Sequence, residues 1–81
     1  MPERPQLTMY STSWCGYCHR LAGQLDREGI AYAVVDIEAE PNAASLVEQV
    51  NAGNRTVPTL VFADGSALTN PSVREVKAKL S

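Results

Sequence analysis

The 81-residue chain is long enough for one domain with a small core, and its 44% hydrophobic content excludes a mainly disordered protein. Its formal net charge is −2 and its basic residues are scattered, so nothing indicates a binding surface for nucleic acid or acidic membranes. No segment has the length and apolar character of a signal peptide or a membrane span. We therefore expect a cytoplasmic protein in which residues 1–81 form a single domain.

The first half of the chain is predicted to form a strand, a helix and a second strand. Gln6–Tyr10 alternates apolar and polar residues, which is typical of a short strand. A helix is predicted from Cys15 to Gly29, and its inner stripe has helical spacing at Cys18, Leu21, Ala22 and Leu25. Ala31–Ile37 is nearly continuously apolar and predicts a strand buried on both faces.

The second half is predicted to repeat this alternation. Pro41 is expected to open a helix that ends at Gly53, with Ala43, Leu46, Val47 and Val50 on its inner face. Thr59–Phe62 predicts a strand, and the Asp-Gly pair that follows indicates a hairpin turn into a brief strand at 67–69. Strands that alternate with helices favour an α/β fold, in which helices cover a single sheet.

The last predicted helix begins at a cap supplied by Asn70 or Ser72, with Pro71 near its first turn. Its inward residues are expected to be Val73, Val76 and Leu80.

The two cysteines of the chain, Cys15 and Cys18, lie three positions apart at the first junction between strand and helix. A disulfide staple is disfavoured because so short a loop removes little entropy from the unfolded chain, and because structural disulfides are rare in the cytosol. A structural zinc site needs four ligands, and only His19 lies nearby, so we expect no metal. A lone pair of this spacing is a weak signal for redox chemistry, and its surroundings must strengthen it.

Those surroundings favour Cys15 as a nucleophile. A cysteine at the start of a helix meets unpaired backbone N–H groups and the positive end of the helix dipole, which favour the reactive thiolate. We expect its sulfur to be reachable from solvent. Cys18 shares a helix face with Leu21 and Leu25, so it is predicted to be a less exposed resolving thiol, with an ordinary core cysteine as the alternative.

The neighbours of the cysteines are candidates for contacting partners. Trp14 is either a contact residue or an edge aromatic of the core, and Tyr17 is expected to project outward towards substrate. His19 and Arg20 are cations in a first helical turn, where they oppose the dipole, and we interpret them as solvated surface residues.

A second candidate region is the segment NRTVPT, residues 54–59. Val57 precedes Pro58 and is therefore biased towards an extended conformation. The backbone of Thr56 and Val57 could pair with an extended substrate. The alternative is a loop that merely begins a strand.

The combination of WCGYC with GNRTVP and DGSALTNPS resembles the glutaredoxin branch of the thioredoxin superfamily, and within it the mycoredoxins. The resemblance runs from about Leu7 to Leu80. It implies a thioredoxin-like fold, with a four-stranded mixed sheet flanked by three helices and a cis Pro58 facing the cysteine pair.

The resemblance also implies a thiol–disulfide oxidoreductase that reduces protein–mycothiol mixed disulfides. In its monothiol mechanism Cys15 is the nucleophile, and Cys18 forms an intramolecular disulfide only in a competing branch. No bound cofactor is expected. Mycothiol is the co-substrate, recycled by an NADPH-dependent reductase, and mycothiolated proteins are the partners of a monomer.

Three further features bear on the substrate. Where glutathione-using relatives usually carry two glycines, this chain has Thr69-Asn70-Pro71-Ser72, and the polar neutral side chains of Asn70 and Ser72 suit the hydroxyls of mycothiol. Helix capping is the alternative role for both residues. Gly16 stands where many glutaredoxins have proline and makes the turn more flexible. Arg55 is included among the expected substrate contacts.

Two other functions remain open within this resemblance. One is a redoxin that takes electrons from thioredoxin reductase and supplies ribonucleotide reductase. The other is a glutaredoxin whose dimer binds an iron–sulfur cluster through Cys15 of each protomer.

Overall fold

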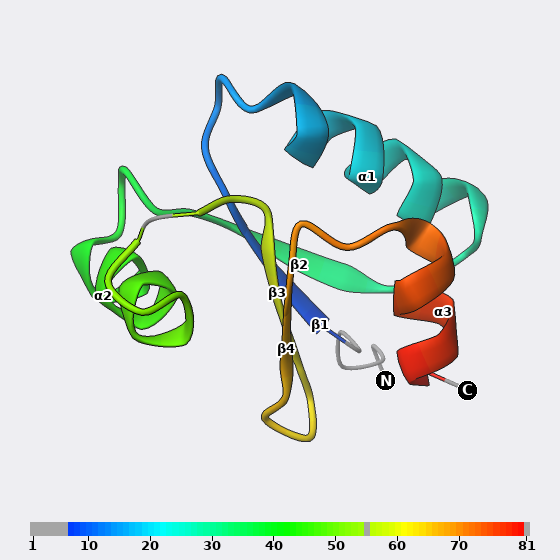
Figure 1. Cartoon of the computed structure of the whole chain (residues 1–81). Coiled ribbons are helices and arrows are strands. Elements are labelled where there is room, and N and C mark those ends of the chain that lie inside the picture. The colour runs from blue at the N-terminus through cyan, green and yellow to red at the C-terminus, as the bar shows by residue number, and fades with distance from the viewer. Residues whose placement is uncertain (1–6, 55, 81) are drawn as a thin grey trace, which may run out of the picture.

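The strands of the protein form one sheet, with helices on both faces (Figure 1). A computed structural model describes residues 7–54 and 56–80. In chain order the elements are β1 (Leu7–Ser11), α1 (Gly16–Arg27), β2 (Tyr32–Asp36), α2 (Pro41–Val50), β3 (Thr59–Phe62), β4 (Ala67–Thr69) and α3 (Val73–Leu80).

The strand order is β2-β1-β3-β4. β1 pairs in parallel with β2 and antiparallel with β3, and β3 pairs antiparallel with β4. Met9 of β1 therefore lies between Val34 of β2 and Leu60 of β3. This arrangement confirms the predicted mixed sheet of four strands with three helices.

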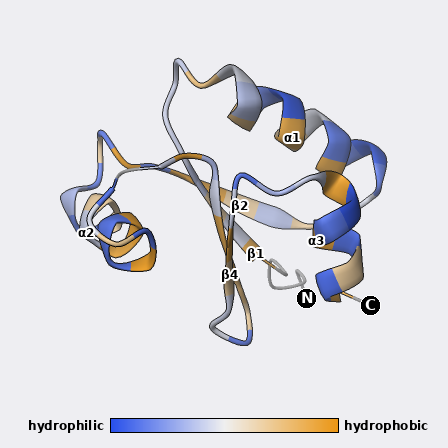
Figure 2. Cartoon of the chain, in the orientation of Figure 1, coloured by the Kyte–Doolittle hydropathy of each residue, from blue (hydrophilic) through white to orange (hydrophobic). Residues whose placement is uncertain are grey.

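The larger hydrophobic cluster lies between the sheet and the helices α1 and α3. It consists of Leu7, Met9, Cys15, Cys18, Leu21, Leu25, Leu60, Phe62 and Val76. In Figure 2 the hydrophobic residues of α1 lie on the side that faces the strands. Complete burial of a side chain such as Leu25 stabilises the fold by about 1.5–3 kcal/mol, and both cysteines belong to this core.

A smaller cluster on the opposite face of the sheet attaches α2. Its buried residues are Ile37, Ala43, Ala44 and Val47, and Tyr10, Val35 and Val57 pack against them. Val57 also packs against the larger cluster. The segment before β3 therefore contacts the cores on both faces of the sheet.

Residues 31–37 were predicted to form a strand buried on both faces. The strand is present, but the prediction of burial on both faces is wrong. β2 is an edge strand, and 56% of Val34 is exposed. An apolar run predicts a strand but does not tell where the strand lies in the sheet. Here β1 pairs with both β2 and β3, and this leaves β2 at the edge.

The predicted inner face of α2 is also partly wrong. Ala43 and Val47 are buried, but Leu46 is half-buried and 39% of Val50 is exposed. At 100° per residue the buried stripe is rotated towards Ala44, which places Leu46 and Val50 at its border.

No helix within residues 7–54 and 56–80 is both long and apolar enough to span a membrane.

Candidate active site

Cys15 is the N-cap residue of α1. Its backbone is extended, with φ −81° and ψ 106°, and its Sγ accepts a hydrogen bond of 3.2 Å from the N–H of Cys18. The carbonyl of Cys15 accepts the N–H of His19 at 3.2 Å, as the first residue of a helix requires. The sulfur therefore lies at the positive end of the helix, against one of its otherwise unpaired donors.

The expectation that the Cys15 sulfur is reachable from solvent is wrong, because Cys15 is buried and only 5% of the residue is exposed. The N-cap hydrogen bond turns its side chain back over the first helical turn and into the larger cluster. The residues around it are open: 71% of Trp14 and 66% of Tyr17 are exposed. Gly16 is exposed, and a Cβ at this position would meet nothing within 4 Å, so the chain beside Cys15 is not covered by other parts of the protein.

Cys18 lies deeper, with 3% of the residue exposed, and packs in the same cluster as Leu21 and Leu25. Burial, together with a hydrogen bond to the Cys15 thiol, raises the pKa of Cys18 from its ordinary 9.0 to about 12. Both cysteines are free thiols. At neutral pH Cys18 is therefore protonated and is a poor nucleophile.

Two residues that the sequence did not single out in these roles shape the turn before Cys15. The carbonyl of Thr12 accepts the N–H of Cys15 at 3.3 Å, and Nε2 of His19 donates to the carbonyl of Ser13 at 3.0 Å. His19 is exposed, as interpreted, but it also ties down this turn. Oγ1 of Thr12 is buried without a hydrogen-bond partner, the one such side-chain atom in the described part of the chain.

The Val57–Pro58 peptide bond is cis, which confirms that expectation. Pro58 is buried, Val57 packs against the cluster that contains both cysteines, and Thr56 is exposed. The carbonyl of Pro58 accepts the N–H of Asn70 at 2.7 Å. The segments 56–58 and 70–72 are thereby joined.

Asn51, at the end of α2, supports this loop and was missed by the sequence analysis. Its Nδ2 donates to Oγ1 of Thr59 at 3.1 Å, and its Oδ1 accepts from Oγ1 of Thr69 at 2.6 Å. Oγ1 of Thr59 in turn donates to the carbonyl of Thr56 at 2.7 Å. Only the order of strands in the folded sheet brings these groups together, so no local sequence pattern could have found them.

A groove of about 370 Å³ runs beside the first two turns of α1. It is lined by Tyr17, Arg20, Leu21, Gln24, Asn70, Pro71, Ser72 and Glu75. The structure therefore brings the predicted residues Tyr17, Asn70 and Ser72 together. Trp14 and the 56–58 segment are not part of its lining, and Arg55 lies outside the described residues.

Arg20, Gln24 and Glu75 are lining residues that the sequence analysis missed. Arg20 was interpreted as solvated surface, and it is exposed, yet it faces this groove. The available signal was spacing: positions 17, 20 and 24 fall on one face of a helix.

The sequence left open whether Asn70 or Ser72 caps α3, and the structure shows that Ser72 is the cap. Its Oγ accepts the N–H of Glu75 at 3.2 Å, and Oε1 of Glu75 accepts the N–H of Ser72 at 3.0 Å. This reciprocal pair is a capping box. Asn70 instead has a positive φ of 46°, and its exposed side chain lines the groove.

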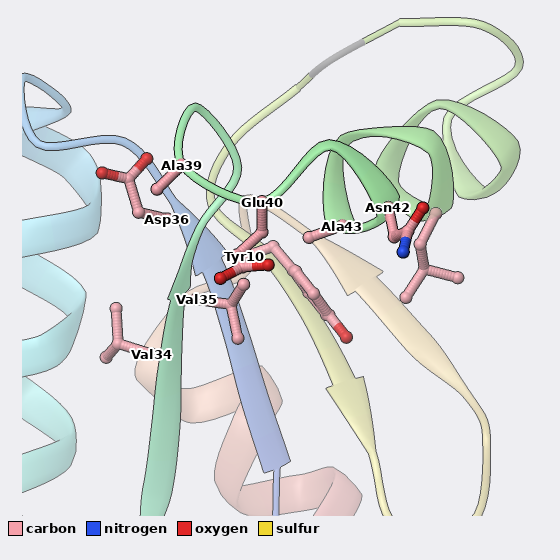
Figure 3. A pocket seen from close by; sticks show the side chains of 9 residues that line it. Tyr10, Val34, Val35, Asp36, Ala39, Glu40, Asn42 and Ala43 are labelled. Carbon is pink, nitrogen blue, oxygen red and sulfur yellow. The ribbon is translucent and has the colours of Figure 1, made fainter.

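A larger pocket, of about 580 Å³, lies between β2 and α2 and contains neither cysteine. Figure 3 shows Tyr10 reaching across it from β1, with Val35 and Glu40 nearby. Within residues 7–54 and 56–80, no group of three or more His, Cys, Asp or Glu residues is placed to hold a metal ion. Of these two hollows, only the smaller groove is lined by a residue of the cysteine motif, Tyr17, which lies between Cys15 and Cys18 in the chain.

Comparisons with known proteins all point to the same protein family. The family model for glutaredoxins matches residues 7–67. A provisionally assigned glutaredoxin of Mycobacterium tuberculosis is 65% identical over 74 residues, covering 91% of this chain and 88% of that protein. Mycoredoxin 1 of Corynebacterium glutamicum is 43% identical over 74 residues, which is 91% of each chain. The solved glutaredoxin of Methanosarcina mazei is 22% identical with a TM-score of 0.81, covering 95% of this chain and 79% of that one, and supports the fold.

Proposed function

The chain belongs to the glutaredoxin family, and on that premise we propose that it is a thiol–disulfide oxidoreductase that removes mycothiol from protein–mycothiol mixed disulfides. The observation that carries the proposal is the hydrogen bond of 3.2 Å from the Cys18 N–H to Cys15 Sγ at the start of α1. A thiolate gains more from such a donor than a neutral thiol does. Cys15 is accordingly the attacking group.

In the first step the Cys15 thiolate attacks the mycothiol sulfur of the mixed disulfide. A bond forms between Cys15 and mycothiol, the original disulfide bond breaks, and the substrate protein leaves as a thiolate that takes a proton from water. In the second step the thiolate of another mycothiol attacks the mycothiol sulfur bound to Cys15. This step releases the Cys15 thiolate and oxidised mycothiol, which an NADPH-dependent reductase returns to two thiols.

The high pKa of Cys18 supports its secondary role. A thiol with a pKa of about 12 has a very small thiolate fraction at neutral pH, so it competes poorly with Cys15 for substrate. Once Cys15 carries mycothiol, Cys18 can lose its proton, attack the Cys15 sulfur and release mycothiol. The product is a Cys15–Cys18 disulfide, which is the competing branch.

The substrate contacts that we propose fall into two groups. Trp14, Gly16 and Tyr17 flank Cys15 along the chain, while Asn70 and Ser72 line the groove together with Tyr17. On the other side, the extended Thr56 and Val57 before Pro58 would pair with the substrate backbone. We keep Arg55 as a proposed contact on the sequence alone.

The proposal is tested by mass spectrometry of the Cys18→Ser protein after exposure to oxidised mycothiol and, separately, to oxidised glutathione. The expected result is an adduct at Cys15 that forms faster with mycothiol. A faster glutathione adduct would replace the proposed co-substrate, and no adduct at Cys15 with either disulfide would refute the monothiol mechanism.

A second assay separates the proposal from a redoxin that depends on thioredoxin reductase. The oxidised protein is mixed with thioredoxin reductase and NADPH, or with mycothiol, and the free thiols are counted over time. We expect reduction by mycothiol. Rapid reduction by thioredoxin reductase without reduction by mycothiol would overturn the choice.

A further inference from the structure

The groove beside α1 combines an apolar floor with a polar rim. Leu21 and Pro71 are buried at its base. Around them stand the guanidinium, amide, hydroxyl and carboxylate groups of Arg20, Gln24, Tyr17, Asn70, Ser72 and Glu75. Sugar and cyclitol rings present apolar faces together with a dense set of hydroxyl donors and acceptors, and this combination fits them.

Several of these polar groups are free to bind a ligand. Among residues 7–54 and 56–80, the side chains of Arg20, Gln24 and Asn70 have no protein partner for a hydrogen bond or an ion pair. They offer donors and acceptors to a ligand without first breaking a bond within the protein.

The groove also lies at a suitable distance from the reacting sulfur. Gln24 lies nine positions after Cys15 along α1, and at 1.5 Å per residue this is about 13.5 Å. Tyr17 and Arg20 fall between them on the same side of the helix. A ligand whose thiol reacts at Cys15 can therefore extend two rings along α1.

The charges in the groove give an anionic ligand no net attraction. Arg20 supplies one positive charge and Glu75 one negative charge, so the rim is neutral overall. Glu75 already accepts the N–H of Ser72 through Oε1, which holds its carboxylate in place. Glutathione carries two carboxylates and a net negative charge, whereas a thiol whose other end is sugar and cyclitol carries none.

We propose that this groove is the binding site for the hydroxyl-rich, uncharged end of the low-molecular-weight thiol, with Arg20 and Gln24 as specificity-determining residues and Glu75 as the group that excludes carboxylates. The inference rests on the proposed function and deepens it. It moves the specificity of the site onto α1, beyond the residues 70–72 that the sequence indicated.

The test compares two disulfides in the Cys18→Ser background. One is oxidised mycothiol, and the other is the disulfide of N-acetylcysteine amide, which has a similar reacting end without the rings and is also neutral. Mass spectrometry gives the rate of adduct formation at Cys15, and the ratio of the two rates isolates the contribution of the rings. Arg20→Ala and Gln24→Ala should each lower this ratio about fivefold to tenfold, the loss expected for one or two hydrogen bonds.

Matched controls are Arg27→Ala and Gln49→Ala, which remove the same side-chain types from exposed positions outside the groove. Both should leave the ratio within about twofold. An unchanged ratio in Arg20→Ala and Gln24→Ala, in a protein that otherwise prefers mycothiol, would overturn the inference and leave the proposed function standing. Equal rates for the two disulfides before any groove substitution would overturn both.

The role of the Glu75 charge is tested by a separate variant. Glu75→Gln keeps an oxygen acceptor for the Ser72 N–H and removes only the negative charge. The rate with oxidised glutathione relative to oxidised mycothiol should rise about threefold, because an exposed charge acts through solvent. No rise, in a protein whose thermal midpoint is unchanged, would show that Glu75 does not exclude carboxylates.

Discussion

The helices α1 and α3 begin with the same hydrogen bond made by different chemistry. At α3 the hydroxyl of Ser72 accepts the N–H of Glu75 at 3.2 Å, and at α1 the sulfur of Cys15 accepts the N–H of Cys18, also at 3.2 Å. The cap of α3 is reciprocal, because Glu75 returns an acceptor to Ser72 at 3.0 Å. Cys18 occupies the corresponding position in α1 and has no carboxylate to return.

The difference lies in how the positive end of each helix is satisfied. α3 carries an acid in its first turn, whereas α1 carries none. The dipole of α3 is therefore compensated by its own side chain, which favours stability. At α1 no side chain of the first turn supplies that negative charge, and the Cys15 sulfur occupies the capping position. The same local geometry therefore serves a reaction instead.

The largest expected effect comes from converting the cap of α1 into that of α3 by Cys15→Ser. Exchange should be lost entirely, because Cys18 is protonated at neutral pH and the chain has no third cysteine. Stability should rise, since serine is a preferred N-cap residue and sulfur is a weak acceptor. A gain of up to about 1 kcal/mol would raise the thermal midpoint by about 4–8 °C.

The two readouts for Cys15→Ser are a disulfide-exchange assay and thermal unfolding under reducing conditions. Residual exchange would show that Cys18 can attack on its own. A lower thermal midpoint would show that the packing of the Cys15 sulfur in the core stabilises the protein more than a serine cap does. The two helix starts would then not be equivalent in the way proposed.

The sequence predicted the start of α1 well and the surroundings of Cys15 poorly, for a physical reason. The stripe of Cys18, Leu21 and Leu25 is local periodicity, and the structure buries all three residues. The burial of Cys15 depends on the cluster formed with Met9 and Leu60 of the sheet, which no local pattern reports.

The same limit applies to the rest of the site. The cis Pro58 came from a family resemblance and not from the residues themselves. Arg20 was interpreted as a solvated cation. Only the packing of α3 beside α1 brings it to the groove with Asn70, and the sequence pattern does not show this packing. Strand order likewise lay outside the sequence pattern, so Val34 was expected to be buried and is exposed.

The next effect is a pH dependence that sharpens the contrast between the two sulfurs of α1. The pKa of Cys18 is about 12 in the folded protein and 9.0 ordinarily, so between these values the folded state binds more protons than the unfolded state. Its contribution is complete below pH 9 and is lost as the pH rises towards 12, with a slope of at most about 1.4 kcal/mol per pH unit. Urea unfolding from pH 8 to 11 measures it.

Cys18→Ser is the control for this alkaline slope, because serine does not titrate in the range. The fall in stability with pH should be shallower in the variant than in the parent protein. Parallel curves would mean that Cys18 has an ordinary pKa and can compete with Cys15 for substrate.

A smaller effect is expected at the reciprocal cap. Ser72→Ala removes the acceptor of the Glu75 N–H and should cost about 1 kcal/mol, which lowers the thermal midpoint by about 4–8 °C. Ser45→Ala is the matched control, since its hydroxyl bonds only the Pro41 carbonyl within α2 and the site is exposed. The control should change stability by less than about 0.5 kcal/mol. Equal losses of stability in the two variants would mean that the capping box contributes no more than an ordinary exposed hydroxyl within a helix.

The smallest effect concerns the hydroxyl that the start of α1 leaves unsatisfied. Oγ1 of Thr12 is buried without a partner, so Thr12→Val should keep the shape, remove an uncompensated polar atom and stabilise the fold by up to about 1 kcal/mol. Thr12→Ser keeps the hydroxyl and loses a methyl group, and should destabilise by about 1 kcal/mol. Urea unfolding ranks the three proteins. If valine instead proves less stable than threonine by 1 kcal/mol or more, the hydroxyl has a partner in solution, and the start of α1 is as fully satisfied as that of α3.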